Sequence, residues 1–266
     1  MIKLYDLLTE QVNAPKAIIL AGAPGAGKGY VLSGLDLSNL KVLNVDNTYI
    51  DLLKKANVSL DLKNASPKDR SEAAKAMAAA NKEFKGKVAA TIQGKESFIL
   101  DGTAASYKQT AELKQQLEEA GYKVAMLYVY TDLERSLKQN QDRFDKSGGE
   151  DRSLSPAIVM RTWKSVTDNL DPYFDLFSPH FIAVANTLEG DKIDNVEDII
   201  KKYLDPYKPT GTKPKTPAQQ KRSEEQKAEL NAAIQTMLSS EFNDEVLQSM
   251  ISKEAAQMRI AQFLRS

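Results

Sequence analysis

Residues 16–28 read KAIILAGAPGAGK, an apolar run that passes directly into a glycine-rich loop and ends in a lysine. The run 16–22 shows no alternation of apolar and polar residues, which is typical of a strand that is buried on both faces. A helical pattern begins at about Lys28. A strand, a glycine-rich loop and a helix in this order are the start of a βαβ unit, so this stretch predicts an α/β fold with a parallel sheet.

The loop itself satisfies the phosphate-binding pattern G-x-x-x-x-G-K. Glycine lets the backbone come close to a phosphate, and successive N–H groups together with the positive end of the following helix attract an anion. The lysine of the pattern, Lys28, would reach the β- and γ-phosphates of a nucleotide. We therefore expect nucleotide binding by nine consecutive residues, which are Gly22, Ala23, Pro24, Gly25, Ala26, Gly27, Lys28, Gly29 and Tyr30.

Four further apolar runs follow and alternate with helical patterns. The expected strands cover 41–45, 97–100, 123–130 and 181–185, and the expected helices cover 3–12, 66–84, 106–120, 132–145, 155–170 and 195–204. This alternation predicts a P-loop NTPase fold of the nucleoside-kinase-like type, with a parallel sheet and helices on both faces. Ligands bind at the carboxyl ends of the strands in such sheets, and most of these runs end next to Asp or Asn.

The pattern changes at residues 205–220, where four prolines predict a linker. Beyond it, residues 221–238 and 241–264 are expected to form two amphipathic helices that make a C-terminal helical hairpin. The apolar stripe expected on the second helix contains Leu247, Ile251, Ala255 and Met258. The predicted domains are therefore a P-loop kinase-like domain at 1–204, the linker at 205–220 and a helical appendage at 221–266.

The composition excludes several kinds of site. The chain has 266 residues, and its 36 basic and 36 acidic side chains give zero net charge, which disfavours nucleic acid as an electrostatically bound partner. There is no Cys and a single His, His180, so a disulfide framework, a thiolate or multi-histidine metal site and a cysteine nucleophile are excluded. No apolar run approaches the roughly 20 residues of a membrane span, and the first residues do not resemble a secretory signal. A cytoplasmic location without membrane association is expected.

Two aspartates at strand ends are candidates for the chemistry of phosphoryl transfer. Asp46 ends the second run, where a carboxylate could accept the proton of an acceptor hydroxyl. The alternative role is the N-cap of a helix that starts near Tyr49, which Asn47 would fill equally well. Asp101 follows the third run, as a Walker-B acid does, and would hold the water shell of Mg²⁺. The alternative for Asp101 is an Asp-Gly turn.

Three arginines, Arg143, Arg152 and Arg161, are spaced nine residues apart, with Gly148 and Gly149 between the first two. Phosphoryl transfer needs cations over the γ-phosphate and exclusion of water, which a mobile arginine-bearing lid provides. Arg143 and Arg152 are therefore expected to be catalytic, together with the lysine of the loop and the first aspartate, while Arg161 is a third or a structural residue. The alternative is that these arginines pair with Asp or Glu on exposed helices.

The loop GAPGAGKG at 22–29 resembles that of the adenylate kinases, GxPGxGKGT, which also has Gly in place of Ser or Thr after the lysine. That family implies a Mg²⁺ ion whose ligands are mostly water and phosphate oxygens, and Gly29 is compatible with this arrangement. Tyr30 departs from the family pattern because it replaces the Thr.

The rest of the chain resembles the zeta-toxin and polynucleotide-kinase-like group of P-loop phosphotransferases. The segments that carry the resemblance are NVDN at 44–47, FILDGT at 98–103 and KVAMLYVYTDLERSLKQNQDR at 123–143. Together with the loop, the resemblance spans residues 16–186.

This resemblance implies roles for individual residues. In the zeta-toxin-like group, the position of Asp46 is that of the general base, and Gly102 and Thr103 of the DGT signature lie beside the acceptor. Arg143 would begin the lid near the adenine, and Arg152 would reach the transferred phosphate.

The sequence thus predicts an ATP-dependent phosphotransferase that uses ATP and Mg²⁺ and a small-molecule hydroxyl acceptor, for which the resemblance suggests a nucleotide sugar. A nucleoside-monophosphate kinase and a polynucleotide 5′-hydroxyl kinase are alternatives. An alternative of another class is a non-catalytic nucleotide-binding assembly protein, whose C-terminal helices bind a protein partner. Residues 50–96, where kinases of this class place acceptor-binding helices, contain no motif that identifies the acceptor.

Overall fold

A parallel sheet lies at the centre of the computed structural model. The structure describes residues 14–33, 35, 37–38, 40–62, 65–148, 151, 154–186, 246 and 249–266. The strands are β1 (Lys16–Ala21), β2 (Lys41–Asn44), β3 (Phe98–Asp101), β4 (Lys123–Tyr130), β5 (Phe181–Ala185) and β6 (Met250–Ile251). Their order is β2-β3-β1-β4-β5-β6, and all neighbouring pairs run parallel. The predicted P-loop NTPase class is therefore confirmed.

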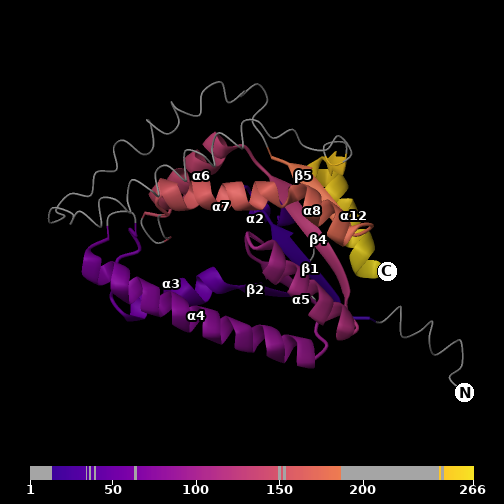
Figure 1. Ribbon diagram of the computed structural model, residues 1–266, viewed down its shortest axis with the longest axis horizontal. Helices are drawn as coiled ribbons and strands as arrows, with labels where there is room; N and C mark the ends of the chain where they lie inside the picture. Colours follow the sequence, from indigo (N-terminus) through magenta and orange to yellow (C-terminus); the bar gives the residue numbers. More distant parts are fainter. Residues whose placement is uncertain are drawn as a thin grey trace, which may run out of the picture.

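Helices cover both faces of this sheet (Figure 1). They are α2 (Lys28–Leu32), α3 (Val45–Lys55), α4 (Pro67–Gln93), α5 (Tyr107–Glu119), α6 (Leu133–Lys146), α7 (Pro156–Asp168), α8 (Leu170–Phe177) and α12 (Lys253–Arg265). Alternate residues of a strand point to opposite faces. In β1, Ile18 therefore packs with α2, α6, α7 and α12, whereas Ile19 packs with α5 and α8. α3 and α4 add an apolar cluster of their own around Leu53 and Ala80.

The register of the sheet brings the loop and two strand ends together. Asn44, the last residue of β2, pairs with Asp101, the last residue of β3. β1 lies next to β3 and runs into the glycine-rich loop, whose first N–H, that of Gly22, donates to the carbonyl of Thr103 at 3.2 Å. The carboxyl ends of β1, β2 and β3 thus form one edge, where parallel sheets bind ligands.

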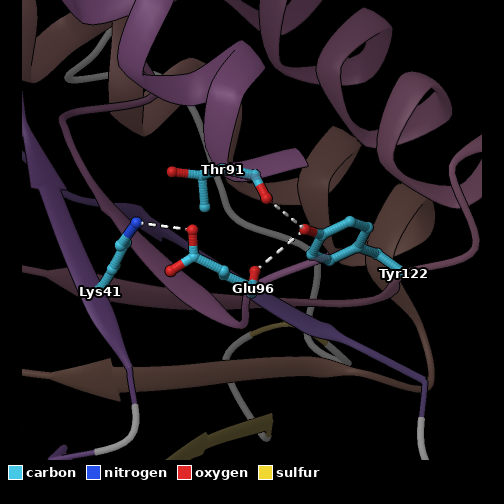
Figure 2. Close-up of polar contacts among 4 residues, drawn as sticks. All are labelled: Lys41, Thr91, Glu96 and Tyr122. Carbon is cyan, nitrogen blue, oxygen red and sulfur yellow. Dashed lines mark hydrogen bonds and ion pairs between the residues drawn. The ribbon is translucent and has the colours of Figure 1, made fainter. Parts of the chain in front are cut away.

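A separate polar cluster closes the opposite edge, at the amino ends of the strands (Figure 2). The hydroxyl of the buried Tyr122 lies 3.1 Å from the carbonyl oxygen of Thr91 and 2.9 Å from that of Glu96. Lys41, which begins β2, pairs with the Glu96 carboxylate at 2.6 Å. These contacts connect the end of α4 to the starts of β2 and β4. None of these polar groups lies at the carboxyl ends of the strands, where ligands bind.

Most predicted elements of the α/β part are confirmed, with differences at helix boundaries. β1, β4 and β5 form within the predicted runs. α4 is longer than expected and reaches Gln93, and α8 adds a helix that was not predicted. α3 begins at Val45, before the expected start near Tyr49, because Asn44 caps it. Among the described residues, no helix is both long and apolar enough to cross a bilayer.

The C-terminal residues differ from the expected continuous helix. Residues 250–251 form β6, which extends the sheet beside β5, and the helix starts only at Lys253 after the cap Ser252. α12 buries Ala256 and Ile260 against the sheet and leaves Met258, a member of the predicted stripe, 69% exposed. The stripe was wrong at Met258, because residues 250–251 form a strand and the helix begins only at Lys253; Ile251 packs against the core from β6, and Leu247 lies outside the described residues.

The described end of the predicted appendage therefore packs as part of the α/β core. The expected helices at 3–12, 195–204 and 221–238 and the linker at 205–220 lie outside the described residues.

Candidate active site

The loop between β1 and α2 is held in one conformation by its neighbours. Gly25 has a φ of 77°, which favours glycine, and a Cβ there would lie 2.8 Å from the carbonyl oxygen of Ser136. The Ser136 hydroxyl donates to the carbonyl of Pro24 at 2.6 Å. At the next glycine, Gly27, a Cβ would collide with the amide of Asn186. The loop is therefore packed tightly between α6 and the end of β5.

Asn186 and Gln139 fasten the loop through its carbonyl groups. The Asn186 amide donates to the carbonyl of Ala26 at 2.8 Å. The Gln139 amide satisfies both of its neighbours when its nitrogen donates to the carbonyl of Gly25 at 2.7 Å and its oxygen accepts from Arg135 at 2.8 Å. These two contacts use carbonyl groups of the loop and occupy none of its N–H groups, which are the groups that bind phosphate in such loops.

Lys28 is the first residue of α2, and its side chain folds back over the loop. Its Nζ donates to the carbonyls of Gly22 at 2.8 Å and Ala23 at 3.2 Å. Burial lowers the pKa of Lys28 from 10.5 to about 8. Nearby Asp101 and Asp46 oppose this fall, and Arg143 adds to it. Lys28 thus shares one electrostatic environment with the other three candidate residues that the structure describes.

Asn44 connects the two candidate carboxylates. Its Nδ2 donates to Oδ2 of Asp101 at 2.7 Å, and its Oδ1 accepts from the backbone N–H of Asp46 at 2.7 Å. Asp46 is therefore not the N-cap of α3 but a residue of its first turn, where the positive end of the helix favours a negative charge. The capping alternatives that the sequence offered, at Asp46 and Asn47, are both wrong because Asn44 makes the cap.

These elements enclose a cleft of about 1010 Å³. Its lining comes from the loop and α2, the strand ends of β2 and β3, the first turn of α3, and α6 and α7. The lining residues are Pro24, Gly25, Ala26, Gly27, Lys28, Gly29, Asn44, Val45, Asp46, Asp101, Gly102, Thr103, Gln139, Asp142, Arg143, Lys146, Ser147, Leu154, Ile158 and Thr162. The cleft is large enough for a nucleotide and a second small molecule.

The cleft brings together most residues that the sequence singled out, from positions more than 100 residues apart. The exceptions are informative. The side chain of Tyr30 is 62% exposed and lies under Lys253, whose Nζ is 3.7 Å from the ring centroid. Arg161 is exposed and does not line the cleft. Gly22 and Ala23 are buried beneath it, and Arg152 lies outside the described residues.

The C-terminal helix supports the short helix that carries Lys28. The Gln257 amide lies 2.9 Å from the carbonyl oxygen of Val31 and 2.7 Å from that of Ser33. These carbonyls lie at the end of α2, where helical hydrogen bonds are missing. The support comes from more than 220 residues away in the sequence.

The donor set at the strand ends fits a magnesium ion held largely by water. Among the described residues, no group of three or more His, Cys, Asp or Glu side chains is arranged to hold a metal. Three carboxylates line the cleft, those of Asp46, Asp101 and Asp142, and the carboxylate of Asp101 has one oxygen occupied by Asn44. Mg²⁺ prefers oxygen ligands and keeps several waters beside one or two carboxylates and substrate phosphates, so this arrangement is compatible with it.

Three kinds of site residue were missed by the sequence analysis. The sequence analysis assigned no site role to Asn44 or Asn186, although an Asn at the end of a buried strand is a signal for the binding edge. Gln139 and Lys146 on α6 line the cleft because the helical period places them one turn either side of Arg143. The ion pair of Arg143 with Asp151 agrees with the alternative that these arginines pair with Asp or Glu, although the sequence did not identify Asp151 as the partner.

This chain resembles known proteins in its sequence and in its fold. The sequence model of one family, described as Zeta toxin, matches residues 3–187. The chain has no match among the curated proteins. The solved AvrRxo1-ORF1:-ORF2 complex is similar with a TM-score of 0.52 and 18% identity, over 96% of this chain and 86% of that one. A structure of the PezAT chromosomal toxin-antitoxin system of Streptococcus pneumoniae has a TM-score of 0.47 and 14% identity, over 84% of this chain and 88% of that one. At 18% identity, the first likeness concerns the fold alone.

Proposed function

Because the chain belongs to the Zeta toxin family, a family of ATP-dependent kinases, we propose that it transfers the γ-phosphoryl group of ATP to a hydroxyl group of a nucleotide-sugar-type small molecule. The observation that carries the proposal is the convergence of Lys28, Asp46, Asp101 and Arg143 on one cleft. Phosphoryl transfer depends on positioning and on stabilisation of charge, which a cationic loop with two carboxylates opposite it can supply.

In this proposal the loop holds the triphosphate. The N–H groups around Gly25 and Gly27 and the positive end of α2 bind phosphate oxygens, and Lys28 reaches the β- and γ-phosphates. The carbonyls of Gly22 and Ala23 that now accept from Lys28 keep its ammonium group directed over the loop. In this proposal ATP binding requires the Lys28 side chain to shift and Arg143 to leave its ion pair with Asp151, without a rearrangement of the loop.

Asp46 accepts the proton of the acceptor hydroxyl as that oxygen attacks the γ-phosphorus. The new bond joins the acceptor oxygen to phosphorus, the bond to the β,γ-bridging oxygen breaks, and ADP leaves. Gly102 and Thr103, which follow Asp101 at the end of β3, line the cleft on the side from which the acceptor would approach. Arg143 neutralises the charge that develops on the transferred group, and Arg152 has the same proposed role.

Asp101 would hold the water shell of Mg²⁺, with its orientation fixed by Asn44. When bound, the ion would neutralise negative charge on the β- and γ-phosphate oxygens.

The acceptor is proposed to lie near the start of α3. Val45 and Asp46 line the cleft from the first turn of this helix, and α3 packs against the long helix α4. The residues that line this side of the cleft, which are Asn44, Val45, Asp46, Gly102 and Thr103, include no basic side chain. A small molecule therefore fits this place better than a polynucleotide, whose backbone requires a basic track. A nucleoside monophosphate is the alternative of similar size.

The test is phosphoryl transfer followed by mass spectrometry, with Mg·ATP and three acceptors in parallel. The acceptors are UDP-N-acetylglucosamine, mixed nucleoside monophosphates and a 5′-hydroxyl oligonucleotide. Phosphate on the first acceptor, absent with the Lys28→Ala variant, supports the proposal. Transfer to one of the other two would reassign the acceptor, and ATP binding without transfer to any would contradict this acceptor class.

A protein partner for residues 221–266 is part of the proposal. Support comes from the similar AvrRxo1-ORF1 structure, which was solved as a complex with ORF2. Because α12 buries Ala256 and Ile260 in its own core, a partner would contact the outer face with Met258. Co-purification of a protein with the tagged chain that is lost in Met258→Asp supports this contact, and retention in the variant contradicts it.

A further inference from the structure

Asn44 ends β2 at the point where the two candidate carboxylates approach each other. A backbone N–H can only donate and a carboxylate oxygen accepts, so the orientation of the Asn44 amide is fixed by Asp46 on one side and Asp101 on the other. Both bonds are 2.7 Å long, and the one to Asp101 has a charged acceptor. Hydrogen bonds to ionised groups are among the strong ones. One planar amide therefore joins the end of β3 to the start of α3.

We infer that Asn44 is a positioning residue for phosphoryl transfer, which sets the orientation of the Asp101 carboxylate relative to the first turn of α3. The inference rests on the proposed function. With Oδ2 of Asp101 held by Asn44, rotation of the carboxylate is restricted and its other oxygen has a fixed direction. The same amide, as the cap of α3, fixes the backbone of Asp46. Asn44 thereby fixes the position of Asp101, which is assigned to the metal shell, relative to Asp46, which is assigned as the base for the acceptor.

The geometry of the sheet explains why this residue can act on both groups. Asn44 and Asp101 are partners in the parallel register of β2 and β3, so their side chains emerge side by side at the same edge. Asp46 follows two residues later, which is the spacing that an N-cap side chain reaches. A pure capping role would need only the acceptor oxygen. The nitrogen that reaches Asp101 is the part of Asn44 that a cap does not require.

The substitution Asn44→Ser separates the capping of α3 from the contact with Asp101. Serine caps helices about as well as asparagine, but its hydroxyl lies closer to its own backbone and does not reach Asp101. Alanine removes both contacts. A matched control is Ser66→Ala, which removes the cap of α4 at an exposed position away from the cleft.

The experiment measures the Kd of ATP by calorimetry with Mg²⁺ and with EDTA, together with the Tm of each full-length variant. We expect Asn44→Ser to keep the wild-type Kd in EDTA and to lower the Tm by less than Asn44→Ala does, but to reduce the gain in affinity from Mg²⁺ by about 10-fold. Asn44→Ala should show the same loss and a Tm lower by about 2–4 °C. Ser66→Ala should lower the Tm and leave the effect of Mg²⁺ unchanged.

An Asn44→Ser variant with the wild-type response to Mg²⁺ would overturn the inference and leave the proposed function intact. A wild-type chain that binds no ATP in either condition would overturn both. A loss of the Mg²⁺ effect in Ser66→Ala as well would show that the effect follows stability rather than position, and this too would overturn the inference.

Discussion

Arg143 and Asp151 form an ion pair across the turn that ends α6, with 2.7 Å between Nε and Oδ2. Arg143 also lines the cleft, so the guanidinium group that is proposed to contact the nucleotide is paired with Asp151 in this structure. Both side chains are partly exposed, at 53% and 25%, and exposed pairs contribute little to stability. A bound triphosphate and Asp151 are therefore competing partners for the same guanidinium group.

Asp151→Asn should increase the affinity for ATP by a few-fold, because Arg143 no longer has to leave an ion pair, and should change stability by less than about 1 kcal/mol. Calorimetric titration with Mg·ATP measures the first effect and thermal unfolding the second. In an Arg143→Ala background, the same substitution should have no effect on affinity. Equal effects in both backgrounds would show that Asp151 does not act through Arg143.

The pH dependence of ATP binding should follow Lys28. Its pKa in the folded protein is about 8, so the charged form that binds phosphate is lost as the pH rises through that value. The Kd of ATP should therefore rise between about pH 7 and pH 9.5, with proton uptake on binding near the upper end. Titrations across this range in two buffers of different ionisation enthalpy measure both quantities. Lys28→Met should bind weakly and without this pH dependence.

Lys28 should make the folded protein more stable as the pH rises, whereas it makes ATP binding weaker. Its pKa in the unfolded chain is near 10.5, above the folded value of about 8, so the unfolded state binds more protons between these values. The free energy of unfolding therefore rises with pH across this window, and below about pH 8 the full penalty of the buried charge is present. Urea unfolding at a series of pH values should show this rise in the wild type and not in Lys28→Met.

Gly25→Ala should destabilise the protein and abolish ATP binding. A Cβ at this position would lie 2.8 Å from the carbonyl oxygen of Ser136 and 3.1 Å from Cβ of Gln139, and the φ of 77° is unfavourable for alanine. We expect the free energy of unfolding to fall by about 1–3 kcal/mol, because the backbone atoms around Gly25 cannot easily move away from the added Cβ. Tm and a titration with ATP measure the result.

Gly86→Ala is the matched control for that substitution. Gly86 lies inside α4, and a Cβ there has no neighbour within 4 Å. Alanine should stabilise the helix by about 0.5–1 kcal/mol and leave ATP binding unchanged. If Gly25→Ala behaved like Gly86→Ala, the close packing of α6 on the loop would be contradicted.

Gln257→Leu should weaken ATP binding from a distance. The substitution removes the donors to the carbonyls of Val31 and Ser33 while keeping most of the side-chain volume. The contact with the Val31 carbonyl is partly buried, and a partly buried carbonyl without a partner costs about 1–3 kcal/mol, so α2 should open more often. Hydrogen exchange of the amides at 28–33 should become faster, and the Kd of ATP should rise. Met258→Leu on the exposed face of the same helix should alter neither.

The central strands could be predicted from the sequence because burial on both faces leaves an uninterrupted apolar run. β4 appears at its predicted bounds, 123–130, and β5 at 181–185. β6 could not be predicted, because two residues carry no period and Met250 and Ile251 fit a helix equally well. Their strand conformation depends on pairing with β5, a partner far away in the sequence.

The candidate site was predictable where a motif fixed the backbone and unpredictable where a side chain connected two elements. Lys28 follows from the loop pattern, and Asp101 from its place after an apolar run. The bridging role of Asn44 required the register of β2 against β3, and the pairing of Arg143 with Asp151 required the path of the chain after α6. Neither of these two contacts joins residues at a fixed spacing in the sequence, so a local sequence pattern cannot predict them.

The dependence of α2 on Gln257 has a consequence for synthesis on the ribosome. The chain emerges from its amino-terminal side, so the loop with Lys28 leaves the exit tunnel more than 200 residues before the helix that braces it. A nascent chain that has folded β1 to β5 still lacks the donors to Val31 and Ser33. We therefore expect full nucleotide affinity only after residue 257 has emerged from the ribosome, so that translation delays the appearance of the competent kinase.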